Sequence, residues 1–291
     1  MVTIIAGTGR LDSVNARSAL FDLYGDHLRS RGGRAPVATL VRLLAALDIA
    51  APAVRTAVSR MVRQGWLAPV RLNDGPGYAL TTRALHRLDE AAARIYGYGQ
   101  APWDGTWHVL VVERVRDRAR RDRIRAGLGY LGYAPLDDTT WIGPRRSPEL
   151  DELLDTEHVR AERFTATHDG DSCGLLARAW DLDALARAYL RWLDDAEEML
   201  KSLSDEPTDE MAFAVRSRLV HEWRKFLFRD PGLPPELLPA GWPGTRAAMF
   251  FETESRRLLP AASRFVDACL NASDSANSGQ GSPAPPAAAE E

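Results

Sequence analysis

Residues 52–65 read Pro-Ala-Val-Arg-Thr-Ala-Val-Ser-Arg-Met-Val-Arg-Gln-Gly, and this stretch decides the expected fold. Proline suits the first turn of a helix and glycine its end, so the stretch predicts one helix. At about 100° per residue, its apolar and polar side chains fall on opposite faces. The apolar face comprises Val54, Ala57, Val58, Met61 and Val62. The polar face comprises Arg55, Thr56, Ser59, Arg60 and Arg63, with no acidic residue.

Two more helices are expected before this one. Residues 15–30 place apolar side chains at helical spacing, and Arg31-Gly32-Gly33 ends that helix. A second helix opens at Pro36, and its leucines recur every three or four residues. The apolar residues of these two helices are Leu20, Leu23, Tyr24, Leu28, Leu40, Leu43, Leu44 and Leu47.

A hairpin is expected after the third helix. Residues 66–72 are typical of a strand, Asn73-Asp74-Gly75 of a tight turn, and residues 78–80 of the returning strand. A helix over residues 82–96 follows. Three helices and a hairpin in this order predict an N-terminal winged helix-turn-helix over residues 15–98.

The polar face of the third helix predicts contact with duplex DNA. A helix fits the major groove, where arginine bonds guanine edges and serine or threonine reaches bases or phosphates. Arg71, near the tip of the hairpin, is expected to contact phosphate. The predicted DNA-binding residues are Arg55, Thr56, Ser59, Arg60, Arg63 and Arg71. The alternative is an ordinary solvated basic face, against which the helix order and the hairpin weigh.

The charge of the chain is unevenly distributed. Residues 1–98 hold 13 Arg and 7 acidic residues, whereas the remainder holds 24 basic and 33 acidic residues. The formal net charge of −3 therefore combines a basic N-terminal third with an acidic body. A polyanionic partner is expected for the N-terminal third alone.

The rest of the chain predicts a middle domain, a helical domain and a tail. Strand, helix, strand, helix and strand follow one another between residues 107 and 167, which favours a ferredoxin-like domain over residues 99–180. Helices near 182–202, 208–228 and 245–269 predict a helical C-terminal domain over residues 181–270. Residues 271–291 lack apolar periodicity and are expected to be a disordered tail. The expected fold class is therefore α+β and multidomain.

Several functional classes are disfavoured by the sequence. No apolar run approaches the roughly 20 residues of a membrane span, and the N-terminal apolar stretch is too short for a signal peptide. We therefore expect a cytoplasmic protein without membrane association. The six His residues show no pair at metal-ligand spacing, and no catalytic grouping or cofactor motif stands out. We therefore expect that the protein binds no metal or cofactor and is not an enzyme.

Short motifs spread over residues 15–268 resemble the PaaX family of regulators. They are Leu23-Tyr24-Gly25-Asp26, Arg31-Gly32-Gly33, Val54-Arg55-Thr56-Ala57, Gly65-Trp66-Leu67, the run from Ala101 to Trp107, and the Pro-rich run from Arg229 to Trp242. The resemblance implies the same three domains, the middle one like a CRISPR-associated nuclease subunit. It also implies a homodimeric repressor of aromatic-acid (phenylacetate) catabolism, which binds operator DNA and is released by an acyl-CoA such as phenylacetyl-CoA.

An effector pocket is expected near the Pro-rich run, because Arg pairs with phosphate and Trp stacks on an aryl or adenine ring. The candidate residues are Trp223, Arg224, Arg229 and Trp242. Core tryptophans beside surface arginines are the alternative.

Two other functions stay open. The first is a metal-dependent nuclease built on the middle domain. Its fold relatives carry Asp at the end of the first strand, where this chain has Glu113. The second is an activator or dual regulator that uses the same DNA-binding domain.

Overall fold

The computed structural model describes residues 15–72, 75–95, 102–204 and 206–278. These residues form two compact units, one from residues 15–72, 75–92, 198–204, 206–221 and 253–278, the other from 93–95, 102–197 and 222–252. The long C-terminal helices are α8 (Leu182–Lys201), α9 (Asp209–Arg224) and α10 (Pro243–Ser278). Their residues divide between the two units, and the boundaries of the three expected domains stay a prediction.

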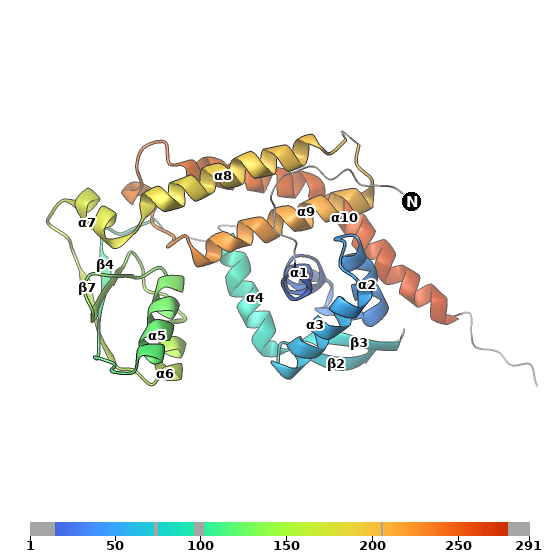
Figure 1. The fold of residues 1–291 in the computed structure, drawn as a ribbon, viewed down its shortest axis with the longest axis horizontal. Helices are drawn as coiled ribbons and strands as arrows, with labels where there is room; N and C mark the ends of the chain where they lie inside the picture. The colour runs from blue at the N-terminus through green and yellow to red at the C-terminus, as the bar shows by residue number, and fades with distance from the viewer. Residues whose placement is uncertain (1–14, 73–74, 96–101, 205, 279–291) are drawn as a thin grey trace, which may run out of the picture. The chain divides into compact units, whose positions relative to one another are not determined.

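The N-terminal part of the first unit contains helices α1 to α3, a three-stranded sheet and then helix α4, in the order that the winged-helix prediction requires (Figure 1). The elements are α1 (Ala16–Leu23), the π-helical turn η1 (Tyr24–Leu28), the 3-10 turn η2 (Arg29–Arg31), β1 (Arg34–Pro36), α2 (Val37–Ala45), α3 (Ala51–Arg63), β2 (Leu67–Leu72), β3 (Gly75–Leu80) and α4 (Thr82–Ile95). The strands are antiparallel in the order β1-β3-β2. The expected first helix is thus three consecutive helical segments, and β1 is a strand that the sequence pattern did not indicate.

Two glycines allow this small sheet to form. Gly65 ends α3 with φ +71°, a left-handed conformation that a residue without Cβ adopts without strain. Gly77 lies at the centre of β3, where a Cβ would come within 2.8 Å of the Ala35 carbonyl oxygen. Gly77 therefore lets β1 pair closely with β3, through Pro36 opposite Gly77.

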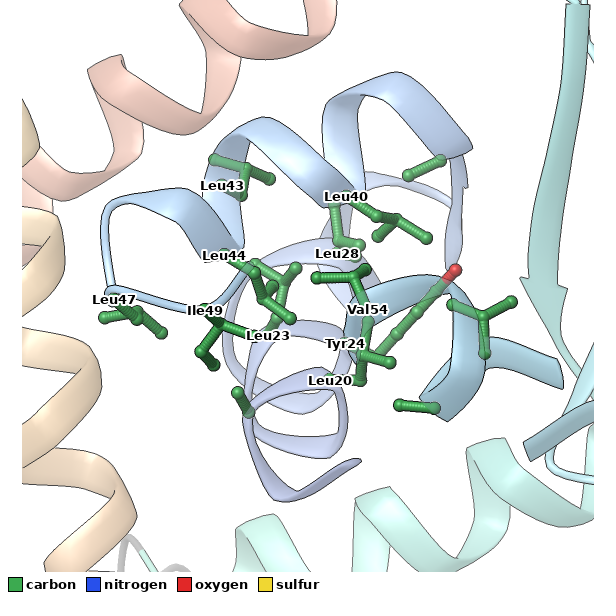
Figure 2. Close-up of a cluster of buried hydrophobic side chains, with 14 of the residues drawn as sticks. Leu20, Leu23, Tyr24, Leu28, Leu40, Leu43, Leu44, Leu47, Ile49 and Val54 are labelled. Atoms are coloured by element: carbon green, nitrogen blue, oxygen red, sulfur yellow. The ribbon is translucent and has the colours of Figure 1, made fainter. Parts of the chain in front are cut away.

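The core of the first unit lies between α1, η1, α2 and α3. Figure 2 shows side chains of this cluster, which come from these segments and from the turn between α2 and α3. The labelled residues are Leu20, Leu23, Tyr24, Leu28, Leu40, Leu43, Leu44, Leu47, Ile49 and Val54. The Tyr24 hydroxyl donates a hydrogen bond to the Tyr78 carbonyl at 2.9 Å, which satisfies the one polar atom that this large side chain brings into the core.

The C-terminal helices complete this core. Phe213 of α9, with Ala262 and Val266 of α10, belongs to the same buried cluster. The Thr39 hydroxyl donates to the Cys269 carbonyl at 3.3 Å, and Arg31 pairs with Asp267 at 2.7 Å. The N-terminal helices therefore share their apolar core with distant segments, and Thr39 and Cys269, for example, are 230 positions apart.

Helix α10 extends to Ser278, so residues 271–278 of the expected tail are helical. Extending an existing helix costs little compared with nucleating one, and a helix can continue without an apolar stripe. Residues 279–291, the rest of that tail, lie outside the described residues.

The second unit contains a four-stranded antiparallel sheet in the order β5-β6-β4-β7. Its elements are β4 (Trp107–Val112), α5 (Arg118–Tyr130), β5 (Ala134–Pro135), β6 (Thr140–Gly143), α6 (Leu150–Thr156), β7 (Ala161–Ala166) and α7 (Ser172–Ala179) (Figure 1). The βαββαβ succession and the strand order match those that the ferredoxin-like prediction requires. One core cluster joins α5 and α6 to the sheet through Leu110, Ile124, Leu128, Trp141 and Leu154.

The second unit also contains an aromatic cluster built from α8, α9 and α10. The 3-10 turns η3 (Lys225–Phe228) and η4 (Pro235–Leu237) follow α9. Tyr189 stacks on Phe226 with ring centroids 4.1 Å apart, and Trp223 stacks on Phe251 at 4.9 Å. Among the described residues, no helix has both the length and the apolarity to cross a membrane.

Candidate functional site

Helix α3 presents opposite surfaces to the protein and to solvent. Its first turn contains Pro52, and Val54, Ala57, Val58 and Met61 are buried. The five residues of the predicted polar face are all exposed: Arg55, Thr56, Ser59, Arg60 and Arg63. The structure thus places these five side chains together on one accessible surface, which we call the α3 face.

The two hydroxyls of the α3 face are held by the helix itself. The Thr56 hydroxyl donates to the Pro52 carbonyl at 2.9 Å, and the Ser59 hydroxyl donates to the Arg55 carbonyl at 3.0 Å. Such bonds to the preceding turn fix the rotamer while the oxygen lone pairs stay exposed. Each hydroxyl is therefore positioned to accept a hydrogen bond from a donor outside the protein.

The α3 face lies in a region that is almost free of carboxylates. Residues 27–72 and 75–88 hold ten Arg and one carboxylate, that of Asp48. Asp48 already pairs with Arg218 at 3.0 Å. Within the described ranges, none of the Arg side chains of the α3 face forms an ion pair or a hydrogen bond in the structure. The positive charge of the α3 face is therefore not neutralised by the described part of the chain.

The hairpin places one more predicted residue near its tip. Strands β2 and β3 pair from Leu67↔Leu80 to Leu72↔Gly75, and Arg71 lies opposite Pro76. Arg71 is exposed. Residues 73 and 74 of the predicted turn lie outside the described residues. Arg71 is therefore accessible near the end of the hairpin, and its contact with phosphate stays a prediction.

A buried charged cluster joins α1 and η1, which pack beside α3, to α9 and α10. The His221 ring nitrogen Nδ1 lies 2.7 Å from the Asp22 carboxylate. The Arg216 guanidinium pairs with Asp26, and its Nε donates to the Ser255 carbonyl at 2.9 Å. Arg216 is only 3% exposed, and burial lowers its pKa to about 10, so it stays charged at neutral pH.

His27 lies in the same cluster and is neutral. It is 1% exposed, with the Phe213 ring centroid 5.3 Å from its own. Burial, and then the nearby Arg31 charge, lowers the pKa of His27 to about 4. No motif in the sequence indicated this cluster. Its only local signal is that Asp22 and Asp26 interrupt the apolar pattern four residues apart.

The residues predicted to bind an effector lie in different surroundings. Trp223 is buried in the aromatic cluster, whereas Trp242 is half-buried, with its ring plane at 80° to that of Tyr189 and 6.3 Å between the centroids. Arg229 is exposed and Arg224 is half-buried. The Tyr189 ring thus brings the two tryptophans together, and Trp223 is a core residue. Their role in binding stays a prediction.

A groove of about 560 Å³ borders the Pro-rich run. It is lined by α7, by Trp180 and the start of α8, and by residues 236–239. Leucine side chains form part of its lining, with carboxylates from Asp181, Asp183 and Glu236 against one Arg178. Residues 236–239 of the Pro-rich run therefore border this groove, whereas the four predicted effector residues do not line it, and the effector pocket stays a prediction.

The nuclease alternative depends on Glu113, which directly follows β4. This carboxylate is exposed and lies 3.5 Å from the Arg160 guanidinium. In the part of the chain that the structure describes, no three His, Cys, Asp or Glu side chains gather to hold a metal ion. No observation therefore favours nuclease chemistry at this position.

Three family models match this chain in succession. They describe a PaaX-like protein at residues 15–84, the PaaX protein central Cas2-like domain at 100–173, and the PaaX-like protein C-terminal domain at 180–268. The transcriptional repressor PaaX of Escherichia coli (strain K12) is 30% identical over 264 residues, covering 87% of this chain and 83% of that protein. The solved structure of the uncharacterized protein Rv0674 from Mycobacterium tuberculosis has 26% identity and a TM-score of 0.59, covering 88% of this chain and 98% of that one.

Proposed function

Since this chain belongs to the PaaX family, we propose that it is a sequence-specific DNA-binding transcriptional repressor. The observation that carries the proposal is the α3 face, an exposed set of arginines and hydroxyls without carboxylate partners among the described residues. The similarity to the transcriptional repressor PaaX of Escherichia coli supports repression as the regulatory outcome. Because a bacterial repressor acts on chromosomal DNA, we place the protein in the cytoplasm.

In this proposal, some residues contact the DNA bases and others contact the DNA backbone. Helix α3 enters the major groove, where Arg55 and Arg60 bond guanine edges while Thr56 and Ser59 accept from base amino groups. Arg63 and Arg71 contact phosphates, which position the protein without reading sequence. The wing adds its contact beside that of α3 because β2 follows α3 after only three residues.

We further propose that the protein acts as a homodimer held by its middle and C-terminal regions. One winged helix covers a single short half-site, whereas a two-fold dimer covers an inverted repeat. The acidic remainder of the chain repels DNA and is free to form this interface. Analytical ultracentrifugation at micromolar concentration tests the proposal. A monomer both alone and on DNA would contradict it.

The effector proposed for this repressor is an acyl-CoA thioester such as phenylacetyl-CoA. Binding would favour a dimer state whose two α3 helices no longer match the groove spacing, which requires different affinities for the two states. A hundredfold loss of DNA affinity corresponds to about 2.7 kcal/mol of coupling. Arg229 and Trp242 offer an exposed cation and a half-buried ring for such a ligand.

The effector is tested by titrating the DNA complex with aryl- and alkyl-CoA thioesters, beside free CoA and the free acids. A thioester that weakens DNA binding supports the proposal, and no response from any thioester overturns it. Arg229→Ala and Trp242→Ala locate the pocket, since an unchanged response in both variants places it elsewhere. Trp223 is left intact because its removal would disturb the aromatic core.

The regulatory function is tested by deleting the gene and measuring transcripts of neighbouring genes. Rising transcripts, together with binding of the purified protein to the intervening DNA, support a repressor. Falling transcripts would identify an activator that uses the same DNA-binding face. Cleavage of that DNA, or of RNA, only when a divalent metal is added would instead identify a nuclease.

A further inference from the structure

Two aromatic rings near the end of α3 each lie beneath the guanidinium group of an arginine. Phe21 and Trp66 meet edge to face, with ring centroids 5.0 Å apart and planes at 85°. The Arg17 guanidinium lies over Phe21 at 5.6 Å from the centroid, and that of Arg83 lies over Trp66 at 5.5 Å. Both rings are half-buried and both arginines are exposed. We call these four residues the arginine–ring patch.

Hydrogen bonds fasten this patch to the C-terminal end of α3. The Trp66 backbone N–H donates to the Met61 carbonyl at 2.9 Å. The Thr81 hydroxyl donates to the Gly65 carbonyl at 2.8 Å and accepts from the Ala84 N–H at 3.2 Å. Thr81 thus joins the start of α4, which carries Arg83, to the end of α3.

The guanidinium groups of the patch are available to an anion. A ring beneath a guanidinium restrains the long side chain, while the edge N–H groups stay free for hydrogen bonds. Residues 15–21 and 75–88 contain no Asp or Glu. Within the described ranges, neither Arg17 nor Arg83 forms an ion pair in the structure. The patch therefore continues the positive charge of the α3 face beyond Arg63.

We propose that Arg17 and Arg83 form a second contact with the DNA backbone, binding phosphates beside the segment that α3 reads. The inference rests on the proposed DNA-binding function and adds residues that the sequence motifs did not indicate. Duplex DNA is the occupant because its phosphates are regularly spaced anions, and arginine binds phosphate with paired N–H donors. Backbone contacts carry no sequence information, so the patch strengthens binding to every duplex alike.

Salt dependence measures such contacts directly. Each phosphate that a protein neutralises contributes about 0.9 to the slope of log affinity against log salt on B-form DNA. Losing both arginines is therefore expected to make the slope shallower by about 1.8. The affinity ratio between an operator and a scrambled duplex should stay unchanged.

The experiment compares the R17Q/R83Q variant with the R187Q/R191Q variant by fluorescence anisotropy over a range of salt concentrations. Arg187 and Arg191 are exposed on α8, so the control removes the same charge from another helix. A shallower slope in R17Q/R83Q alone, on both duplexes, supports the proposal. An unchanged slope, or an equal change in both variants, overturns it.

The outcome separates this inference from the proposed function. If the unchanged protein binds no duplex, the DNA-binding function itself fails. If it binds and R17Q/R83Q keeps its full slope, only the backbone contact fails. Thermal unfolding of each variant shows whether the fold is retained. A variant with single-step unfolding at the melting temperature of the unchanged protein makes its slope directly comparable.

Discussion

Helices α3 and α5 each have 13 residues and are rich in arginine, yet their arginines have different surroundings. On α5, Arg120 donates to the carbonyls of Glu157 and His158 at 2.7 and 2.5 Å. Arg123 pairs with the Glu157 carboxylate at 2.9 Å, which lowers the pKa of that carboxyl. On α3, Arg55, Arg60 and Arg63 have no such partners among the described residues.

We infer from this difference that the partners of the arginines, and not their number, indicate which helix is available to DNA. Helix α5 has five arginines and α3 has three. The arginines of α5 that bind Glu157, His158 and the carbonyl of Arg116 fasten α5 to neighbouring segments. The arginines of α3 are left for an external anion. Arg216 differs from both groups, because its charge is buried and is paired with the Asp26 carboxylate.

The largest effect is expected where a charge is buried. Replacing Arg216 by Met leaves the Asp26 carboxylate without its cation in a site where it is 9% exposed. Removing one partner of a buried ion pair costs about 3–5 kcal/mol, so the free energy of unfolding should fall by that amount. Urea denaturation at pH 7 measures it.

The double variant Arg216→Met, Asp26→Asn is the matched control, because it removes both charges and should recover part of the lost stability. A loss below about 1 kcal/mol in the single variant would contradict a buried, structural Arg216. The charge of Arg216 would then contribute as little to stability as that of an exposed arginine.

The second effect concerns the neutral member of the same cluster. The pKa of His27 is about 4 in the folded protein against 6.5 in the unfolded chain. Between these values the unfolded chain binds the proton and the folded protein does not, so stability falls as the pH drops through this window. Linkage gives a loss of about 2 kcal/mol between pH 7 and pH 5.

Urea denaturation at both pH values tests this expectation, with His27→Gln as the comparison. The variant should lose less stability on acidification, because its side chain does not titrate. If both proteins lose stability equally, His27 is not the group responsible, and the cluster is more accessible to water than its burial indicates.

The smallest effect is expected at the edge of the α3 face. Arg63→Gln and Arg71→Gln should each make the salt dependence of DNA binding shallower by about 0.9, alike for all sequences. Arg118→Gln on α5 is the control, since Arg118 is also exposed but lies near Asp122, at 3.9 Å. A slope that changes as much in the control would remove the distinction between the two helices.

The sequence predicted the parts of the site that depend on local pattern. The two faces of α3 follow from the helical period, and the hairpin follows from turn residues between apolar runs. Strands β1 and β5 were missed because three and two residues are too few to show alternation. The π-helical turn η1 divides a segment whose apolar spacing suggested one continuous helix.

Contacts between distant segments were beyond sequence reasoning. Asp22 and His221 are 199 positions apart, and no local pattern pairs them. The apolar residues Phe213 and Val266 fit any helical core, so their place in the core of the first unit depends on tertiary packing. For the same reason the sequence could not distinguish Trp223 as a core residue from Trp223 as a ligand platform.

The central claim is that α3, and not α5, contacts DNA, and one comparison tests it most directly. Operator affinity is measured by fluorescence anisotropy for Arg55→Ala, Arg60→Ala and for Arg120→Ala, Arg123→Ala. Each bidentate contact with a base contributes about 1–3 kcal/mol, so the α3 pair should weaken operator binding by about 30-fold or more. The α5 pair should bind as the unchanged protein does and melt at a lower temperature. Unchanged operator affinity in the α3 pair, or an equal loss in both pairs, would contradict the account.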